Sequence, residues 1–64
     1  MSFYDNVKEV ADQKKMSIRE IEIRAGVANG TIGKWRTGQP MAETLFKVAA
    51  VLEVPAADLM KGVS

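Results

Sequence analysis

The sequence predicts an all-α fold, a compact five-helix domain. Glycine, proline and serine divide the 64 residues into five short segments. Four segments have the apolar spacing of one helix face, and none alternates as a strand does. Below roughly 70–80 residues a single core supplies only a few kcal/mol, so the helices must pack closely or the chain must self-associate. We therefore expect one domain over residues 1–64.

The first expected helix begins after Ser2. Ser2 and Asp5 have the spacing of a capping box, and Lys14 and Lys15 suit the carboxyl end of the helix. Its predicted buried face consists of Phe3, Val7, Val10 and Ala11.

The second expected helix begins after Ser17. Ser17 can accept from free backbone N–H groups, Glu20 can reach back to complete a capping box, and Arg24 can pair with Glu20. Gly26 stands where a left-handed residue would end the helix. The predicted buried residues are Ile18, Ile21 and Ala25, whereas Ile23 lies on the opposite face.

A third helix is expected over residues 28–37, almost directly after the second. Ile32 and Trp35 form its buried side, and Gly38 and Pro40 end it. Two short helices joined by such a tight glycine-containing turn form a helix-turn-helix.

The fourth expected helix runs from Ala42 to Leu52 and ends before Pro55. A fifth is expected over residues 55–61, with Gly62 as its terminator. The buried face of the fourth helix consists of Leu45, Val48, Ala49 and Leu52, and the fifth segment carries the apolar residues Leu59 and Met60.

The motif IREIEIRAGVANGTIGKW, residues 18–35, resembles the helix-turn-helix of the phage repressor and Cro (XRE-like) family. Residues 44–49 and 52–59 resemble the fourth helix of that family and the start of its fifth. The resemblance covers nearly the whole chain. It implies a lambda-repressor-like domain with helices 2 and 3 as the helix-turn-helix, and a DNA-binding transcriptional regulator, most simply a repressor.

Three residues depart from the pattern of that family. Glu22 stands where a small residue is usual, which affects how closely the two helices of the motif approach. Ala28 stands where Ser or Thr usually caps the third helix, so that helix lacks a cap unless Asn29 provides it. Arg36 stands where an acid is frequent, and it adds a charge that can bind phosphate.

Charge is distributed unevenly along the chain. Between Ile23 and Ala42 there are three basic residues and no acidic one, whereas the rest of the chain carries six basic and eight acidic residues. A positive segment centred on the third helix suits a nucleic-acid partner, although a solvated surface would explain three charges alone.

The third helix is expected to read base pairs in the major groove of double-stranded DNA. Asn29 can bond adenine, Lys34 can donate to guanine, and Thr31 can contact thymine. Gly30 and Gly33 share the outward face, where each costs about 1 kcal/mol relative to Ala, and a closely approaching surface would explain why side chains are absent there. A helix of marginal stability is the alternative explanation for these glycines. The expected base-reading residues are Asn29, Gly30, Thr31, Gly33 and Lys34.

Phosphate contacts are expected at both ends of the motif. Ser17 and Arg19, with the free N–H groups that open the second helix, can hold one phosphate. Arg36, Thr37 and Gln39 flank the far end of the third helix and can hold another, although a solvated side chain is the simpler explanation for Thr37 and for Gln39.

Useful specificity requires a two-fold dimer, because one helix reads only a few base pairs. We expect a weak homodimer that forms mainly on a palindromic operator, and control by protein concentration or a second protein instead of a small-molecule effector. By resemblance, the dimer contacts come from Val54, Pro55, Ala56, Asp58, Leu59 and Met60.

The sequence argues against catalysis, metals and cofactors. It contains no Cys and no His, and the Gly33-Lys34 pair lacks the other residues of a phosphate loop. The longest apolar run, Val48 to Leu52, cannot span a bilayer, and the first residues lack the features of a secretory signal. We therefore expect no cofactor, no membrane partner and a cytoplasmic location in a bacterial or phage-infected cell.

A protein-interaction module, of the antitoxin or adaptor kind, is the alternative function. Exposed Ile23 and the apolar residues Leu59, Met60 and Val63 favour it. Phosphate contacts release counterions, so a steep salt dependence of binding would favour the regulator.

Overall fold

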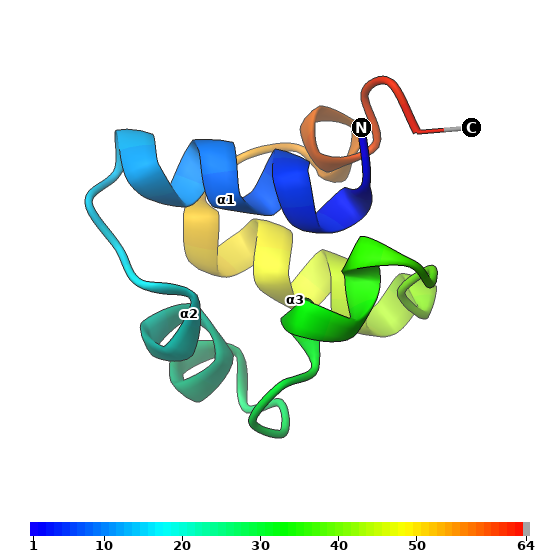
Figure 1. Ribbon diagram of the computed structural model, residues 1–64. Helices are drawn as coiled ribbons and strands as arrows, with labels where there is room; N and C mark the ends of the chain where they lie inside the picture. The colour runs from blue at the N-terminus through cyan, green and yellow to red at the C-terminus, as the bar shows by residue number, and fades with distance from the viewer. Residues whose placement is uncertain (64) are drawn as a thin grey trace.

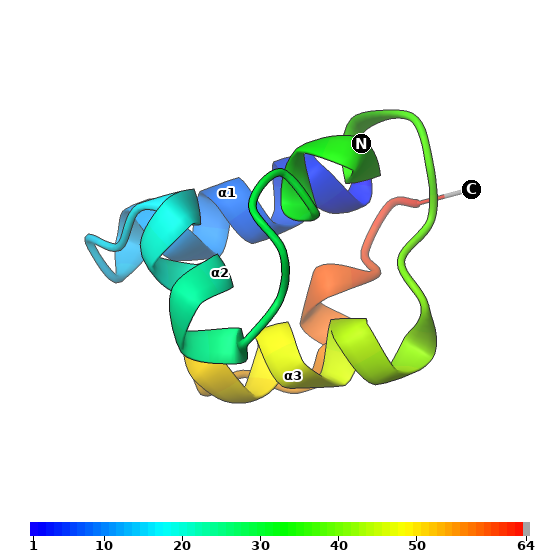
Figure 2. The same ribbon diagram turned by 90° about the horizontal axis from the view of Figure 1, so that it is seen from below.

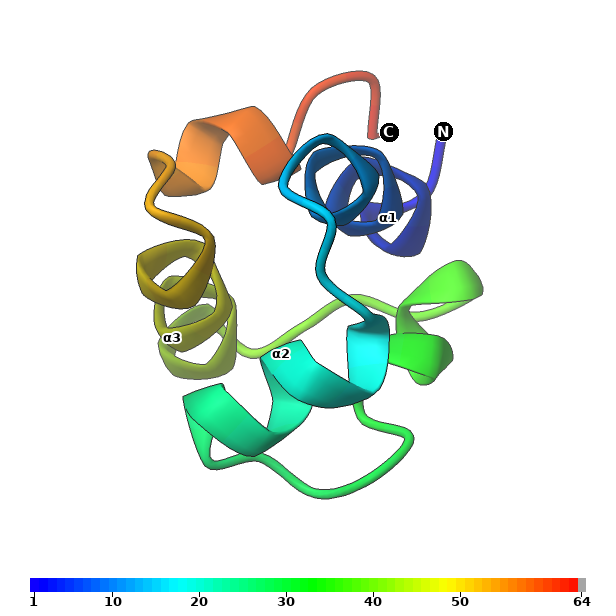
Figure 3. The same ribbon diagram turned by 90° about the vertical axis from the view of Figure 1, so that its left-hand side faces the viewer.

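The computed structural model describes residues 1–63, and within that range the chain is all-helical and contains no strand (Figure 1). α2 packs on α3, and α1 packs on both η1 and η2 (Figures 1 and 3). The elements are the α-helices α1 (Phe3–Gln13), α2 (Ile18–Ala25) and α3 (Ala42–Leu52), and the 3-10 helices η1 (Ile32–Arg36) and η2 (Ala56–Leu59).

The capping box predicted for α1 is confirmed. The Ser2 hydroxyl oxygen accepts from the Asp5 N–H at 3.1 Å, and the Asp5 carboxylate accepts from the Ser2 N–H at 3.1 Å. α1 ends at Gln13 with Lys14 as its C-cap, and Lys15 has a φ of 57°. The residues predicted for its buried face lie inward, with Val10 half-buried and Phe3, Val7 and Ala11 buried.

The predicted limits of α2 are also confirmed, with one difference in its capping. Ser17 accepts from the Glu20 N–H at 3.0 Å, and Gly26 ends the helix with a φ of 72°. The Glu20 carboxylate lies 2.8 Å from Arg24 Nη2 and does not complete a capping box. Its ion pair with Arg24 is the interaction predicted from their i,i+4 spacing.

One hydrophobic core joins all five elements. Most of the residues predicted from helical spacing belong to it, including Ile32 and Trp35 of η1 and the whole predicted face of α3. The core residues are Phe3, Val7, Ala11, Ile21, Ile32, Trp35, Leu45, Val48, Ala49, Leu52 and Leu59.

Two of the five predicted helices are 3-10 helices in the structure. The segment expected to be helical over 28–37 is a turn up to Thr31 and then η1, because Gly30 has a φ of 88°, outside the helical region. Thr31 stands at the N-cap position of η1, but its side chain makes no capping hydrogen bond. The N–H of Lys34 still donates to Gly30 O at 3.3 Å, an i→i+4 bond, so the segment is close to an α-turn.

The second correction concerns the fifth predicted helix. It is reduced from 55–61 to Ala56–Leu59. Pro55 precedes it in an extended conformation, and Gly62 follows with a φ of 68°. So few residues between proline and glycine cannot offset the cost of nucleating an α-helix.

The two ends of the described chain meet beside α1 (Figure 1). The Asn6 side-chain amide, which is buried, donates to Leu59 O at 2.9 Å and to Lys61 O at 2.7 Å. The terminal amino group of Met1 donates to Gly62 O at 3.3 Å. None of the helices in residues 1–63 is long and apolar enough to cross a membrane.

Candidate nucleic-acid interface

The turn between α2 and η1 lies on the surface, on the side away from α1 (Figures 1 and 3). After Gly26, the N–H of Val27 donates to Glu22 O at 3.1 Å, and the N–H of Thr31 donates to Ala28 O at 3.2 Å. Figure 2 shows this turn running beside α2 into η1. The geometry is that of two helical elements joined by a tight turn, as the sequence predicts.

A carboxylate from α2 holds this turn. Glu22 is only 2% exposed, and it accepts from the Gly30 N–H at 3.1 Å and from the Ile32 N–H at 3.0 Å. Neither Ala28 nor Asn29 caps η1. From the sequence, Glu22 was identified as a departure from the family pattern, but this role was missed. Two departures together were the available signal: an acid stands where a small residue is usual, and the following helix has no cap at Ala28.

The expected base-reading residues follow one another through the turn and η1. Asn29, Gly30 and Lys34 are exposed, and Thr31 and Gly33 are partly exposed. The Thr31 hydroxyl donates to Ala28 O at 2.7 Å, so its proton is already engaged. Its hydroxyl oxygen and methyl group are the parts left for a partner.

The two glycines of this stretch have different explanations. Gly30 has a positive φ of 88°, so its own backbone requires glycine, which corrects the interpretation that both glycines need a close partner. Gly33 has no positive φ, and a Cβ built there meets nothing within 4 Å. Neither strain nor packing in the free protein accounts for Gly33.

The expected phosphate contacts lie at the two ends of the motif. Ser17 and Arg19 are exposed at the start of α2, and the Arg19 side chain lies 3.7 Å from the Glu22 carboxylate. Arg36, Thr37 and Gln39 are exposed at and beyond the end of η1. All five side chains are therefore accessible.

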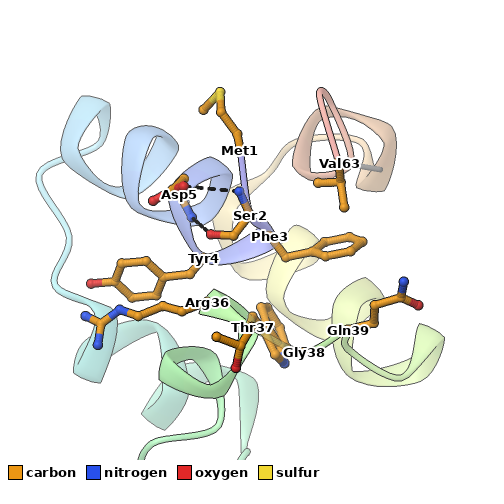
Figure 4. Close-up of a pocket in the computed structure, with 11 residues that line it drawn as sticks. Met1, Ser2, Phe3, Tyr4, Asp5, Arg36, Thr37, Gly38, Gln39 and Val63 are labelled. Carbon is orange, nitrogen blue, oxygen red and sulfur yellow. Dashed lines mark hydrogen bonds between the residues drawn. The ribbon is translucent and has the colours of Figure 1, made fainter.

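Arg36 lies against α1. Its guanidinium carbon is 4.2 Å from the centre of the Tyr4 ring, a cation–π geometry that sequence reasoning missed (Figure 4). Both residues line an open pocket of about 630 Å³ between the start of α1 and the end of η1. Thr37, Gln39 and Asp5 also line it.

Asp5 is the acidic group of this pocket. Hydrogen bonds from the Ser2 backbone N–H and then from the Ser2 side chain lower the pKa of Asp5, and the charge of Arg36 adds a smaller effect in the same direction. Asp5 is therefore an anion that caps α1 and lies near the predicted phosphate contact.

The segment between Ile23 and Ala42 has no acidic residue, but a buried carboxylate lies directly beneath it. Among residues 1–63, the ion pairs involve neither Lys34 nor Arg36, so both cations are available to a partner. Glu22, directly before that segment, places a buried negative charge beneath it.

The residues expected at a dimer interface do not form a uniform surface. Leu59 is completely buried in the core and cannot contact a partner while η2 stays folded, which corrects that part of the prediction. Asp58 pairs with Lys61 at 3.5 Å. The expected contacts that remain at least partly exposed are Val54, Pro55, Ala56, Asp58 and Met60.

Several large apolar side chains are exposed outside this interface. Ile23 is 62% exposed, as predicted, and Phe46 on α3 is 60% exposed. Met41 is also exposed. Sequence reasoning did not single out Phe46 or Met41.

The helix-turn-helix family model HTH_3 matches residues 7–59 of the chain. A relative from Bacillus subtilis (strain 168), the uncharacterized HTH-type transcriptional regulator RghRB, is 31% identical over 61 residues. The match covers 91% of the present chain but 44% of the relative, so the chain spans less than half the length of that protein. No solved structure matches the chain significantly.

Proposed function

The chain belongs to the HTH_3 helix-turn-helix family, and from this membership we propose that it binds double-stranded DNA as a transcriptional regulator. The name of its Bacillus relative, an HTH-type transcriptional regulator, supports the same function. The function is binding and includes no chemical step.

The observation that supports this proposal most directly is the exposed polar stretch after α2. Asn29 and Lys34 are exposed and Gly33 is partly exposed, in a turn and helical segment that is held against the core by Ile32 and Trp35. In a helix-turn-helix protein the second helical element enters the major groove. Asn29 and Lys34 have the donors and acceptors that read adenine and guanine there, and Thr31 offers its methyl group to thymine.

Sequence-independent affinity comes from phosphate contacts on either side of this stretch. Arg19 with Ser17 at the start of α2, and Arg36 with Thr37 and Gln39 after η1, bind the two flanking phosphates in this proposal. Tyr4 supports it, because its ring holds the Arg36 guanidinium in a defined position.

The active form is proposed to be a weak homodimer on a palindromic operator, with half-sites about 34 Å apart, and the regulator to be a repressor. The residues proposed to supply the contact are at least partly exposed: Val54, Pro55, Ala56, Asp58 and Met60. This surface is too small to hold a stable dimer in solution, so the dimer is proposed to form mainly when both copies are bound to DNA. The proposal also includes a cytoplasmic location and control by protein concentration or by a second protein.

Selection from a randomised duplex pool tests the function. The wild type is expected to enrich a palindromic consensus, with affinity that falls steeply between about 50 and 200 mM salt. Asn29→Ala and Lys34→Ala should lose preference at individual base pairs, whereas Lys8→Ala on the exposed face of α1 should not. Enrichment of no sequence at either salt concentration contradicts the proposal.

Exposed Ile23, Phe46 and Met41 favour a second candidate, a protein-interaction module. A partner bound through these residues is expected to show little dependence on salt, because no counterions are released. Substitution of Ile23 and Phe46 by serine would then abolish binding, whereas Lys34→Ala would leave it unchanged.

A further inference from the structure

Glu22 is the only charged residue buried in the described chain, where its only buried polar companion is Asn6. Burying a carboxylate costs several kcal/mol unless hydrogen bonds or a counter-charge compensate it. The residue therefore needs partners, and its surroundings show what they are.

The partners of Glu22 are mostly backbone groups of the turn. Its Oε2 accepts from Gly30 N at 3.1 Å and from Ile32 N at 3.0 Å, and its Oε1 lies 3.3 Å from Gly30 N. Arg19 Nη1, at 3.7 Å, is a weaker and largely exposed contact. One side chain of α2 thus fixes two amides that flank Thr31.

We propose that Glu22 is a positioning residue for DNA reading: its carboxylate sets the backbone of residues 30–32 and so the presentation of Asn29, Thr31 and Lys34 to bases. This inference rests on the proposed DNA-binding function. The Thr31 hydroxyl bonds Ala28 O but leaves the N–H groups of Gly30 and Ile32 to Glu22, and η1 has no side-chain cap of its own. Gly30 has a φ of 88°, and because glycine allows many backbone conformations, this part of the turn needs an external contact to hold one of them.

The same contacts separate positioning from electrostatic attraction. The amides of Gly30 and Ile32 are occupied by a carboxylate, so they do not bind a DNA phosphate. The negative charge of Glu22 opposes the approach of DNA, and its removal cannot weaken phosphate-driven binding. Loss of the hydrogen bonds from Gly30 and Ile32 to Glu22 should therefore lower affinity for the operator without lowering affinity for unrelated DNA.

Three substitutions distinguish the geometry of Glu22 from its charge. Glu22→Asp keeps the charge but withdraws the carboxylate by about 1.5 Å, one carbon–carbon bond. Glu22→Gln removes the charge and turns an amide donor toward the Gly30 N–H or Arg19. Glu20→Gln removes a charge from the same helix at a residue that pairs only with Arg24, and it is the matched control.

The experiment begins with the consensus that the wild type selects from a randomised duplex pool. Absence of a consensus contradicts the proposed function itself. With a consensus established, fluorescence anisotropy gives the affinity of each variant for that duplex and for a scrambled duplex. Measurements are made below the thermal unfolding transition of every variant.

For Glu22→Asp, the ratio of the two affinities is expected to fall about tenfold, the size of one lost bidentate base contact, with scrambled-duplex affinity within about twofold of wild type. Glu22→Gln should lower the ratio without weakening scrambled-duplex binding, and it replaces Glu22→Asp if that variant does not fold. Glu20→Gln should retain the wild-type ratio.

Two results overturn the inference while leaving the proposed function intact. One is a wild-type affinity ratio in folded Glu22→Asp and Glu22→Gln. The other is an equal loss of affinity for both duplexes, which indicates a purely structural role.

Discussion

At the scale of single residues, Gly33 is the position whose identity the free protein explains least. It lies in η1 between Ile32 and Lys34, has open space around its missing Cβ and needs no positive φ. Alanine there removes conformational freedom from the unfolded chain at no steric cost. The retained glycine is therefore consistent with a partner surface that approaches the backbone.

Gly33→Ala is expected to raise stability by up to about 1 kcal/mol and to weaken operator binding. Thermal unfolding and anisotropy titration measure the two effects. Ala50→Gly, on the exposed face of α3, is the control and should lower stability with affinity unchanged. Unchanged operator affinity of Gly33→Ala would contradict the close approach of DNA.

Asp5 gives the protein a defined dependence on acid. Its pKa in the folded protein is lowered, chiefly by the backbone N–H of Ser2, so ionised Asp5 stabilises the folded state. That contribution is present above the unfolded pKa of about 3.9 and is lost as the pH falls through the lower folded value. The midpoint of thermal unfolding should therefore decrease below about pH 4.

Asp5→Asn isolates this effect, because asparagine does not titrate. The wild type should be more stable than the variant at pH 6, and the difference should shrink toward pH 2.5. Circular dichroism melts at a series of pH values measure it. A constant difference over this range would show that Asp5 ionisation does not stabilise the fold.

At the scale of elements, the contact between α1 and the end of the chain depends on Asn6. Its side-chain amide donates to the carbonyl oxygen of Leu59, the last residue of η2, and to that of Lys61, which follows η2. η2 is too short to form alone, so this amide and buried Leu59 keep it in place.

Asn6→Ala is expected to destabilise the domain by about 1–3 kcal/mol, because the buried carbonyl of Leu59 and the part-buried carbonyl of Lys61 lose their donor. Urea unfolding followed by circular dichroism measures the change. Gln13→Ala, at the exposed end of the same helix, should change stability by no more than about 0.5 kcal/mol. Equal effects of the two substitutions would show that Asn6 does not secure η2.

The third predicted helix shows how far local patterns reach. Its buried residues, Ile32 and Trp35, were correctly assigned from their spacing. Its conformation was not, because neither the positive φ of Gly30 nor the two hydrogen bonds to Glu22 follow from periodicity. α3, which has a strong pattern and no such contact, was predicted with its correct ends.

At the scale of the whole molecule, the proposed phosphate contacts lie at opposite ends of the motif and come from separate elements. Arg19 belongs to α2, and Arg36 ends η1, beside Tyr4 of α1. Each should contribute one released counterion when DNA binds.

Arg19→Ala and Arg36→Ala are each expected to reduce the slope of log affinity against log salt by about 0.9. They should weaken binding to all sequences similarly, in contrast to Asn29→Ala. Lys8→Ala, whose partner is Asp12 on α1, is the control and should retain the wild-type slope. An unchanged slope in either arginine variant would remove that residue from the phosphate contacts.

The sequence by itself determined the elements whose causes are local. Ser2 with Asp5, Ser17 and Gly26 mark helix ends, and the apolar spacing of α3 defines its buried face. These features depend on residues three or four apart, which remain neighbours in any helix. Asn29 and Lys34 are exposed as predicted, but Asn29 lies in the turn and not on the helix face that the spacing predicted.

Only the tertiary structure decided how distant segments support one another. Glu22 reaches Gly30 and Ile32, Asn6 reaches the end of the chain, and Tyr4 meets Arg36. Such contacts arise once the core fixes the relative position of α1, α2 and η1. The sequence shows which side chains have donors, acceptors or charges, but packing determines which of them meet.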